Sequence, residues 1–303
     1  MVVAIFGTPL IGPDETSSLN RGKGTQQGSL PNSRLEKCIG SGVVIDESGL
    51  VLTSNDIVKK AGRLTVKLFD GRKAPVTRLG WDPDLDVALL RIEESGYFQA
   101  AGLGDASSLR VGQTVAVISN PAGLEHAFKV GMICGLNRYA GVAGIPGLHA
   151  FVPYIQTDAM LDKGSLGSPL FDADGKVVGI GCKVHTVIHG MGFAVPIDLV
   201  NELLPKLKKG WKGRPWLGVE LLPPLDAGDE LGPVVSKLVP GGPMDSAGIM
   251  AGDRIMEFAG YAVADRERLK QILENAEPGK PVRVKIRRDQ KELELSVTPA
   301  IRP

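Results

Sequence analysis

Short apolar runs separated by turn residues fill most of the chain. Between residues 39 and 92, runs such as GSGVVID, LVLTS, LTVKLF and DVALLRI have the length of strands, and a hairpin turn is expected at Asp70 and Gly71. A second set, which includes TVAVIS, AFKVGMICGL and GMGFAVP, lies between residues 114 and 196. The pattern predicts two successive groups of about six short strands, as in two packed β-barrels.

Other segments break this pattern. Val2 to Phe6 reads as a first strand, and residues 7–35 are polar and rich in Gly, Ser and Pro, which predicts a long mobile loop. The sequence IDLVNELLPKLK at 197–208 has helical spacing, with Pro205 expected to kink or confine the helix. The basic stretch KKGWKGRPW predicts a linker, so we expect one domain at 1–210 and a linker with a small α+β domain at 211–303.

Composition narrows the class of protein. The 303 residues are 43% hydrophobic and carry a net charge of +1, which gives no electrostatic sign of a nucleic-acid partner. The 39 glycines and 21 prolines favour strands and turns over an all-helical fold. No apolar run approaches the roughly 20 residues of a membrane span. The first residues lack the basic region of a signal peptide, so an export signal would lie upstream of this sequence or have been removed from it.

Cysteines and histidines offer weak signals for metal or redox chemistry. Cys38, Cys134 and Cys182 allow at most one disulfide, and the last two lie in expected strands, which favours buried free thiols. His185 and His189 are four residues apart, and only a turned loop would bring both imidazoles to one ion. We expect no cofactor and no metal, and a metal-binding structural module that uses these two histidines stays as an alternative.

Six motifs in order resemble one known family. The segments LTSNDIV, DPDLDVALL, GSLGSPL and GFAVP follow one another at the spacing found in HtrA/DegP-type trypsin-like serine proteases, and WLGV with SAGIMAGDRI resembles the PDZ domain of those proteins. The resemblance extends from Ile39 to Pro299. It implies a mostly β protein, with a chymotrypsin/trypsin-like double six-stranded β-barrel followed by an α+β PDZ domain.

Three positions of the resemblance would carry the catalytic chemistry. Asp56 stands where the family has its histidine base, Asp86 matches the aspartate that orients that base, and Leu166 stands at the nucleophile position. Leucine has no atom that can attack a carbonyl. Backbone N–H groups at Gly164 and Leu166 would remain as an oxyanion pocket. Asp86 is explained equally well as a vestige of the triad or as a residue that holds loop backbone by hydrogen bonds.

These substitutions lead to the expectation that the chain is not an enzyme. The main interpretation is a catalytically inactive HtrA-like pseudoprotease that binds peptides or unfolded protein segments as a scaffold, sensor or chaperone. The alternative is a residual or rewired serine endopeptidase that uses Ser165 or Ser168, the hydroxyls that flank Leu166.

The second domain keeps the residues that a PDZ domain uses. The resemblance places Trp216, Leu217, Gly218 and Val219 in the turn that receives a peptide carboxylate, followed by a peptide-pairing strand at 220–222 and a helix at 265–275. The alternative for Trp216, with less weight, is packing in the core without a ligand. The implied partners are polypeptide C-termini or unfolded segments, with a homotrimer or association with an active paralogue, in the periplasm or cell envelope.

Overall fold

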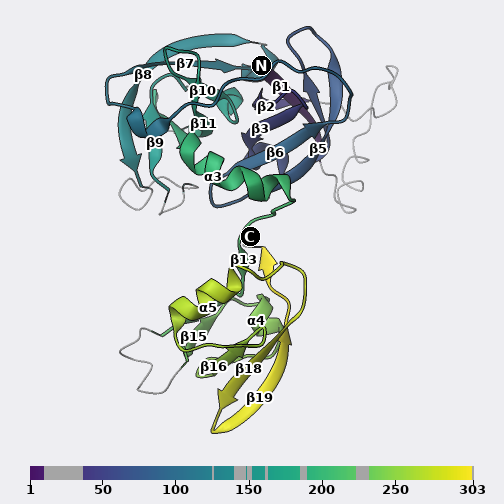
Figure 1. Ribbon diagram of the computed structural model, residues 1–303, viewed down its shortest axis with the longest axis vertical. Helices are drawn as coiled ribbons and strands as arrows, with labels where there is room; N and C mark the ends of the chain where they lie inside the picture. The colour runs from purple at the N-terminus through teal and green to yellow at the C-terminus, as the bar shows by residue number, and fades with distance from the viewer. Residues whose placement is uncertain are drawn as a thin grey trace, which may run out of the picture. The chain divides into compact units, whose positions relative to one another are not determined.

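A computed structural model describes most of the chain, which forms two compact units, Met1–Trp211 and Lys212–Pro303. Each unit has its own sheets (Figure 1). The described residues are 1–9, 37–124, 126–139, 148, 152–160, 163–184, 190–222 and 232–301.

The first unit begins with a closed antiparallel barrel. Its strands pair in the order β1-β2-β3-β6-β5-β4. Burial differs between the strands. Over the first half of β5 every second residue is buried, as expected for a strand with one face in the core. Strand β3 lies between β2 and β6, and all of its residues are buried. The bounds are β1 (Val2–Pro9), β2 (Lys37–Val44), β3 (Leu50–Ser54), β4 (Ala61–Lys67), β5 (Lys73–Asp82) and β6 (Val87–Ile92), with helix α1 (Asn55–Val58) after β3.

A second closed barrel follows in the same unit, with strand order β10-β11-β12-β9-β8-β7. Short 3-10 turns connect several of its strands, and one of them, η3, leads into the GSLGSPL segment. The bounds are η1 (Ala106–Ser108), β7 (Thr114–Ser119), η2 (Pro121–Gly123), β8 (Ala127–Arg138), β9 (Tyr154–Thr157), η3 (Lys163–Ser165), β10 (Pro169–Phe171), β11 (Val177–Val184) and β12 (Gly192–Pro196).

Helix α3 (Ile197–Lys208) packs against both barrels of this unit. Its buried residues join a hydrophobic cluster that takes Leu52 and Leu89 from the first barrel and Phe193 from the second. Gly80 of β5 allows the close approach, because a Cβ there would lie 2.6 Å from the Leu207 carbonyl oxygen. The two barrels therefore form one rigid support for the loops between them.

The second unit is an α+β domain with its own core. Its largest sheet has the order β17-β16-β18-β19, and β14 pairs with β15 in a separate two-stranded sheet. Asp265 caps α5, since its Oδ1 accepts the Arg268 amide at 2.8 Å. The bounds are β13 (Pro215–Trp216), β14 (Val219–Leu221), β15 (Val235–Leu238), α4 (Pro243–Ser246), β16 (Arg254–Phe258), β17 (Tyr261–Ala262), α5 (Arg266–Leu273), β18 (Val282–Arg288), β19 (Lys291–Val297) and β20 (Ala300–Ile301).

Several local expectations need correction. Strand β1 continues to Pro9 because its last residues pair with β4, so residues 7–9 are not loop, and residues 10–35 of the expected loop lie outside the described residues. Helix α3 runs through Pro205 without ending. The peptide-pairing strand begins at Val219, one residue earlier than expected. Cys134 is partly exposed because the strand face that carries it is only half covered, whereas Cys182 is buried.

Candidate functional site

Asp56 and Asp86 lie together in the first barrel. Asp56 is the second residue of α1, which directly follows β3, and Asp86 lies in the turn between β5 and β6. The Asp56 amide donates to Asp86 Oδ1 at 2.7 Å, and the Ser54 hydroxyl donates to Asp86 Oδ2 at 2.7 Å. The Asp56 carboxylate points to solvent and pairs with Lys59 Nζ at 2.6 Å. Asp86 thus holds the backbone at the start of α1 by a hydrogen bond, which agrees with the interpretation of Asp86 as a residue that fixes loop backbone.

The environment of Asp86 changes its protonation. Burial of the carboxyl, reinforced by the negative charge of Asp56, raises the pKa of Asp86 to about 8, although the hydrogen bonds from Ser54 and Asp56 oppose this. Asp86 also has a φ of 54°, in the left-handed region that costs a residue with a side chain about 1–2 kcal/mol. The carboxyl of Asp86 therefore gives up its proton at a higher pH than an exposed aspartate does.

Leu166 lies in the loop between η3 and β10, and backbone hydrogen bonds hold this loop. The Leu166 carbonyl accepts the Ser41 amide at 3.0 Å, and the Gly167 amide donates to the Gly181 carbonyl at 2.6 Å. Gly167 has a φ of 77°, and a Cβ there would collide with the Ser41 carbonyl. The 3-10 turn η3 (Lys163–Ser165) directly precedes Leu166, so the Leu166 amide lies where the i to i+3 hydrogen bond of that turn closes. The oxyanion pocket expected at Gly164 and Leu166 therefore stays a prediction.

A buried polar cluster fixes the start of the same loop. The Ser41 hydroxyl donates to the Gly164 carbonyl at 2.8 Å and accepts the Asn120 amide at 2.9 Å. Asn120 also donates through Nδ2 to the Val3 carbonyl at 3.2 Å. Sequence reasoning missed Ser41, Asn120 and the Ser54 partner of Asp86. Only the polarity of these residues inside apolar runs could have pointed to them.

The two serines that flank Leu166 both point away from solvent. Ser165 and Ser168 each have 0% exposure, and the Ser168 hydroxyl donates to the Ser165 carbonyl at 2.5 Å. Ser54, whose hydroxyl bonds Asp86, is also 0% exposed. In this conformation none of these three hydroxyls can reach a bound peptide.

Histidines do not complete the site among the described residues. The ring of His126 lies edge-on to Phe69, with 5.0 Å between ring centroids, and its amide donates to Asn120 Oδ1. His149, His185 and His189 lie outside the described residues, so the expected metal alternative at the last two stays a prediction. Within the described part of the chain, no group of three or more His, Cys, Asp or Glu side chains could hold a metal ion.

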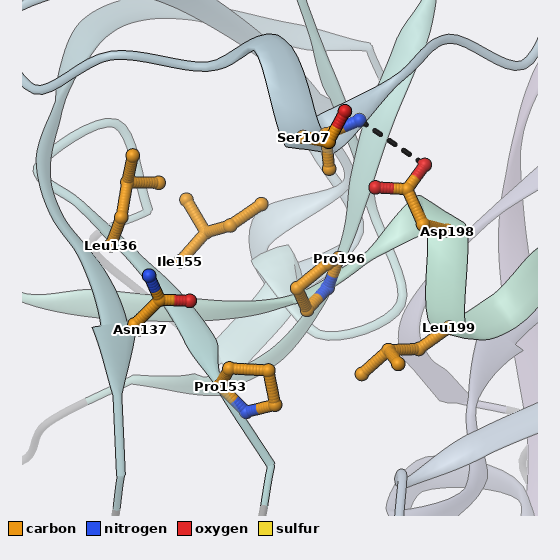
Figure 2. A pocket seen from close by; sticks show the side chains of 9 residues that line it. Ser107, Leu136, Asn137, Pro153, Ile155, Pro196, Asp198 and Leu199 are labelled. Atoms are coloured by element: carbon orange, nitrogen blue, oxygen red, sulfur yellow. Dashed lines mark hydrogen bonds between the residues drawn. The ribbon is translucent and has the colours of Figure 1, made fainter.

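A cavity of about 220 Å³ lies elsewhere on the second barrel (Figure 2). Apolar side chains form most of its wall, and Asp198 at the start of α3 is its charged group, with Oδ1 accepting the Ala106 amide at 3.3 Å. The wall contains none of the three triad positions. Its residues are Ala106, Ser107, Leu136, Asn137, Pro153, Ile155, Pro196, Asp198 and Leu199.

The turn before β14 has the geometry of an anion-binding turn. Leu217 is buried at 3% exposure, while Gly218 has a φ of 72° and a Cβ there would lie 3.1 Å from the Gly242 Cα. The Gly218 carbonyl accepts the Val239 amide at 2.9 Å, which fixes the turn against β15. For the amides of Leu217 and Gly218, no acceptor is described in the residues that the structure covers. Two N–H donors are thus presented beside a strand edge.

Fold and sequence together define a trypsin-like peptidase domain joined to a PDZ domain. The family of trypsin-like peptidase domains matches residues 40–180, and the PDZ family matches residues 215–298. With the relatives below, these matches show that the chain belongs to the HtrA family of serine proteases.

The relatives carry protease names. The chain is 34% identical over 278 residues to the "Putative serine protease HhoA" of Synechocystis, and this match covers 86% of the chain and 70% of HhoA. It is 33% identical over 282 residues to the "Probable periplasmic serine endoprotease DegP-like" of Halomonas elongata, covering 89% of the chain and 58% of that protein. The chain thus spans little more than half the length of several relatives.

Solved structures give the same family. The HtrA-type protease AlgW with a decapeptide has a TM-score of 0.63 and 27% identity, and the match covers 100% of this chain and 95% of AlgW. A serine endoprotease from Yersinia pestis, at 22% identity and a TM-score of 0.59 over 100% of this chain and 94% of that one, shows the fold alone. The expected double barrel with a PDZ domain is confirmed.

The expectation that the chain is not an enzyme needs correction. The relatives are named serine endoproteases, and nothing in the comparisons shows a loss of activity. The expectation rested on the identity of the residues at positions 56 and 166, which is not a measurement of turnover. The structure brings Asp56 and Asp86 into hydrogen-bond contact, and no comparison tests the roles assigned to Asp56, Asp86 and Leu166.

Proposed function

We propose that this chain handles polypeptides by capturing a free C-terminus in its PDZ domain. The observation that carries the proposal is the turn at Leu217 and Gly218, where two amides without a described acceptor precede the strand β14. A carboxylate that accepts both amides would gain charge-assisted hydrogen bonds. The match to the PDZ family supports this use of the domain, and the similar protease AlgW has been solved with a decapeptide.

The edge of β14 supplies the second element. The Gly218 carbonyl and the Leu222 amide both point toward β15, where they bond Val239 and Val234. Because backbone groups alternate along a strand, the N–H and C=O of Val219 point to the opposite edge. In the described residues, β14 has no strand partner on that edge. An extended peptide would add there as a further strand.

Peptide binding with and without a C-terminal carboxylate tests the proposal. Fluorescence anisotropy with a labelled peptide ending in an apolar residue should give binding that C-terminal amidation weakens by at least about tenfold. Gly218→Val should abolish binding, because the new side chain meets Gly242 and fills the space of the carboxylate. Gly279→Val is the matched control, since φ there is also positive and no atom lies near its Cβ. Equal binding of amidated and free peptides would overturn the proposal.

A second candidate function is endopeptidase activity, which the names of the relatives favour. Cleavage in this chain would use Ser165 or Ser168, and both need a change of the loop around Leu166 because they are buried. Degradation of denatured casein should then be lost in Ser165→Ala or Ser168→Ala and kept in Ser48→Ala, which changes an exposed serine. Degradation that survives both loop substitutions would exclude these serines as nucleophiles.

We propose a periplasmic location and an oligomeric state for this chain. Seven of the relatives are described as periplasmic, and among the described helices none is long and apolar enough to cross a membrane. A homotrimer, or a mixed assembly with a related protease, fits the exposed apolar side chains of β8, where Phe128 and Val130 are 65% and 60% exposed. Light scattering after size exclusion distinguishes a trimer from a monomer, and a monomer at micromolar concentration would refute self-association.

A further inference from the structure

The cavity on the second barrel combines an apolar wall with one carboxylate (Figure 2). Leu136 of β8, Ile155 of β9 and Leu199 of α3 supply much of its apolar surface. Among the described residues of the wall, Asp198 is the one that carries a charge. The whole wall belongs to the unit Met1–Trp211. The cavity is therefore separate from the turn of the PDZ unit that is proposed to bind C-termini.

One oxygen of the Asp198 carboxylate is available to a ligand. Oδ1 accepts the Ala106 amide at 3.3 Å, whereas Oδ2 accepts no hydrogen bond from the residues that the structure describes. Figure 2 shows this second oxygen on the side of Asp198 that faces the other labelled side chains. Asp198 has no ion pair within the described chain, and the ion pair that α3 does form joins Lys208 to Asp46 at 3.9 Å. The charge of Asp198 thus has no counter-ion among the described side chains.

The other polar groups of the wall do not neutralise this charge. The Ser107 hydroxyl donates to Asp105 Oδ1 at 2.6 Å and is thereby occupied. Asn137 is exposed, and Figure 2 shows its amide across the cavity from Asp198. The amide oxygen can accept a hydrogen bond but carries no charge. The described wall therefore offers one anionic acceptor and one neutral acceptor, with apolar surface between them.

This combination favours an organic cation over other classes of ligand. A neutral apolar molecule would displace water from Asp198 Oδ2 without replacing its hydrogen bond, and an anion would be repelled. A calcium or magnesium ion needs about six oxygen ligands, and in the described residues no group of three or more His, Cys, Asp or Glu could hold a metal. An ammonium or guanidinium group donates a charge-assisted hydrogen bond to a carboxylate, while its aliphatic stem covers apolar wall.

The size of the cavity limits the ligand to a short chain. Pockets for drug-sized ligands have volumes of about 300–1,000 Å³, whereas this cavity has about 220 Å³. At roughly 30 Å³ for each heavy atom, the share of a molecule in liquid water, the cavity holds about seven heavy atoms. A linear aliphatic amine, or the side chain of one lysine, has this size and shape.

We propose that this cavity binds an organic cation, in which an ammonium or guanidinium group on an apolar stem pairs with Asp198. A free aliphatic amine and a lysine side chain of a polypeptide share this chemistry. The inference goes beyond the proposed capture of C-termini, because the site lies in the other unit and uses no residue of the PDZ turn.

NMR titration of the full chain with two small molecules of equal size tests the pairing. Pentylamine, which is a cation at pH 7, should shift the Ala106 amide and the methyl groups of Leu136, Ile155 and Leu199, and bind about fivefold more tightly than pentanol. The ratio of the two affinities should fall toward one at about 0.5 M NaCl, because salt screens a partly exposed ion pair. Capped tripeptides with lysine or glutamine in the middle identify the source, since only a polypeptide ligand requires that the lysine peptide shift the same resonances.

Variants of two carboxylates on α3 separate a local contact from a general negative field. Asp198→Asn keeps an oxygen for the Ala106 amide and removes the charge, so the preference for pentylamine over pentanol should disappear while pentanol binding stays unchanged. Glu202→Gln is the matched control, because it removes an exposed carboxylate one turn later on α3, outside the cavity wall, and should keep the preference. Equal binding of pentylamine and pentanol to the wild type, an equal effect of both variants, or no shift of the cavity resonances at millimolar amine would overturn the inference.

Discussion

Replacing Asp86 by Asn should make the first unit more stable, and the gain should grow with pH. The carboxyl of Asp86 has a pKa of about 8 in the folded chain, against 3.8 as its ordinary value. Between these two values the folded state holds a proton that the unfolded state releases. Stability therefore falls as pH rises from about 4 to 8. Asn keeps the shape and the neutral charge of the protonated group, so this pH dependence disappears.

The size of the effect follows from the shift. Each pH unit between the two pKa values removes up to about 1.4 kcal/mol, so the rise from pH 5 to pH 8 removes up to about 4 kcal/mol. This is an upper limit, because Asp86 keeps part of its surface in solvent. For a unit of this size the limit corresponds to about 10 °C in melting temperature. Asp56→Asn should reduce the effect without removing it, because burial is the larger cause of the shift.

Scanning calorimetry of the full chain at several pH values between 5 and 8 measures this. The transition of the first unit in Asp86→Asn should lie above that of the wild type by a margin that widens toward pH 8. Asp174→Asn, which removes an exposed carboxylate, should show no widening. A constant difference between the wild type and Asp86→Asn across the pH range would refute the reasoning.

Three further predictions concern stability. Gly167→Ala should lower the melting temperature of the first unit by a change on the order of 3 kcal/mol, because its Cβ collides with the Ser41 carbonyl at a positive φ; circular dichroism on heating measures it. Arg288→Gln should cost the PDZ unit about 3–5 kcal/mol in urea titrations, because it leaves Asp253, which is 1% exposed, without its charged partner. Arg283→Gln removes an exposed ion pair and should stay within about 1 kcal/mol of the wild type.

Much of the fold could be predicted from local pattern. The spacing of apolar residues in IDLVNELLPKLK predicts a helix over 197–208, and the structure has α3 with those bounds, because Asp198 in the first turn and two lysines in the last suit the helix dipole. The turn at Asp70 and Gly71 could be predicted because glycine adopts the positive φ that the tight turn between β4 and β5 requires. Helix α3 and the turn at Asp70 and Gly71 both depend on interactions between residues that are close in sequence.

The failures come from residues far apart in sequence. The extension of β1 to Pro9 comes from pairing with β4, and a polar sequence gives no sign of a partner some 50 residues away. Cys134 is partly exposed for a similar reason, since the packing of its strand face depends on which elements cover the barrel. The raised pKa of Asp86 could not be predicted either, because its burial and its neighbours become visible only in the fold.

Hydrogen bonds of the backbone and of Ser41 hold the loop around Leu166. Its fixed points are the Ser41 hydroxyl on the Gly164 carbonyl, the Ser41 amide on the Leu166 carbonyl, and the Gly167 amide on the Gly181 carbonyl. None of these contacts uses the side chain at position 166. A substitution at position 166 therefore removes none of these three hydrogen bonds. Because the hydrogen bonds that hold the loop do not involve the side chain at position 166, substitutions at Ser41 or Gly167 test the loop conformation. Substitutions at position 166 test the chemistry of the nucleophile position.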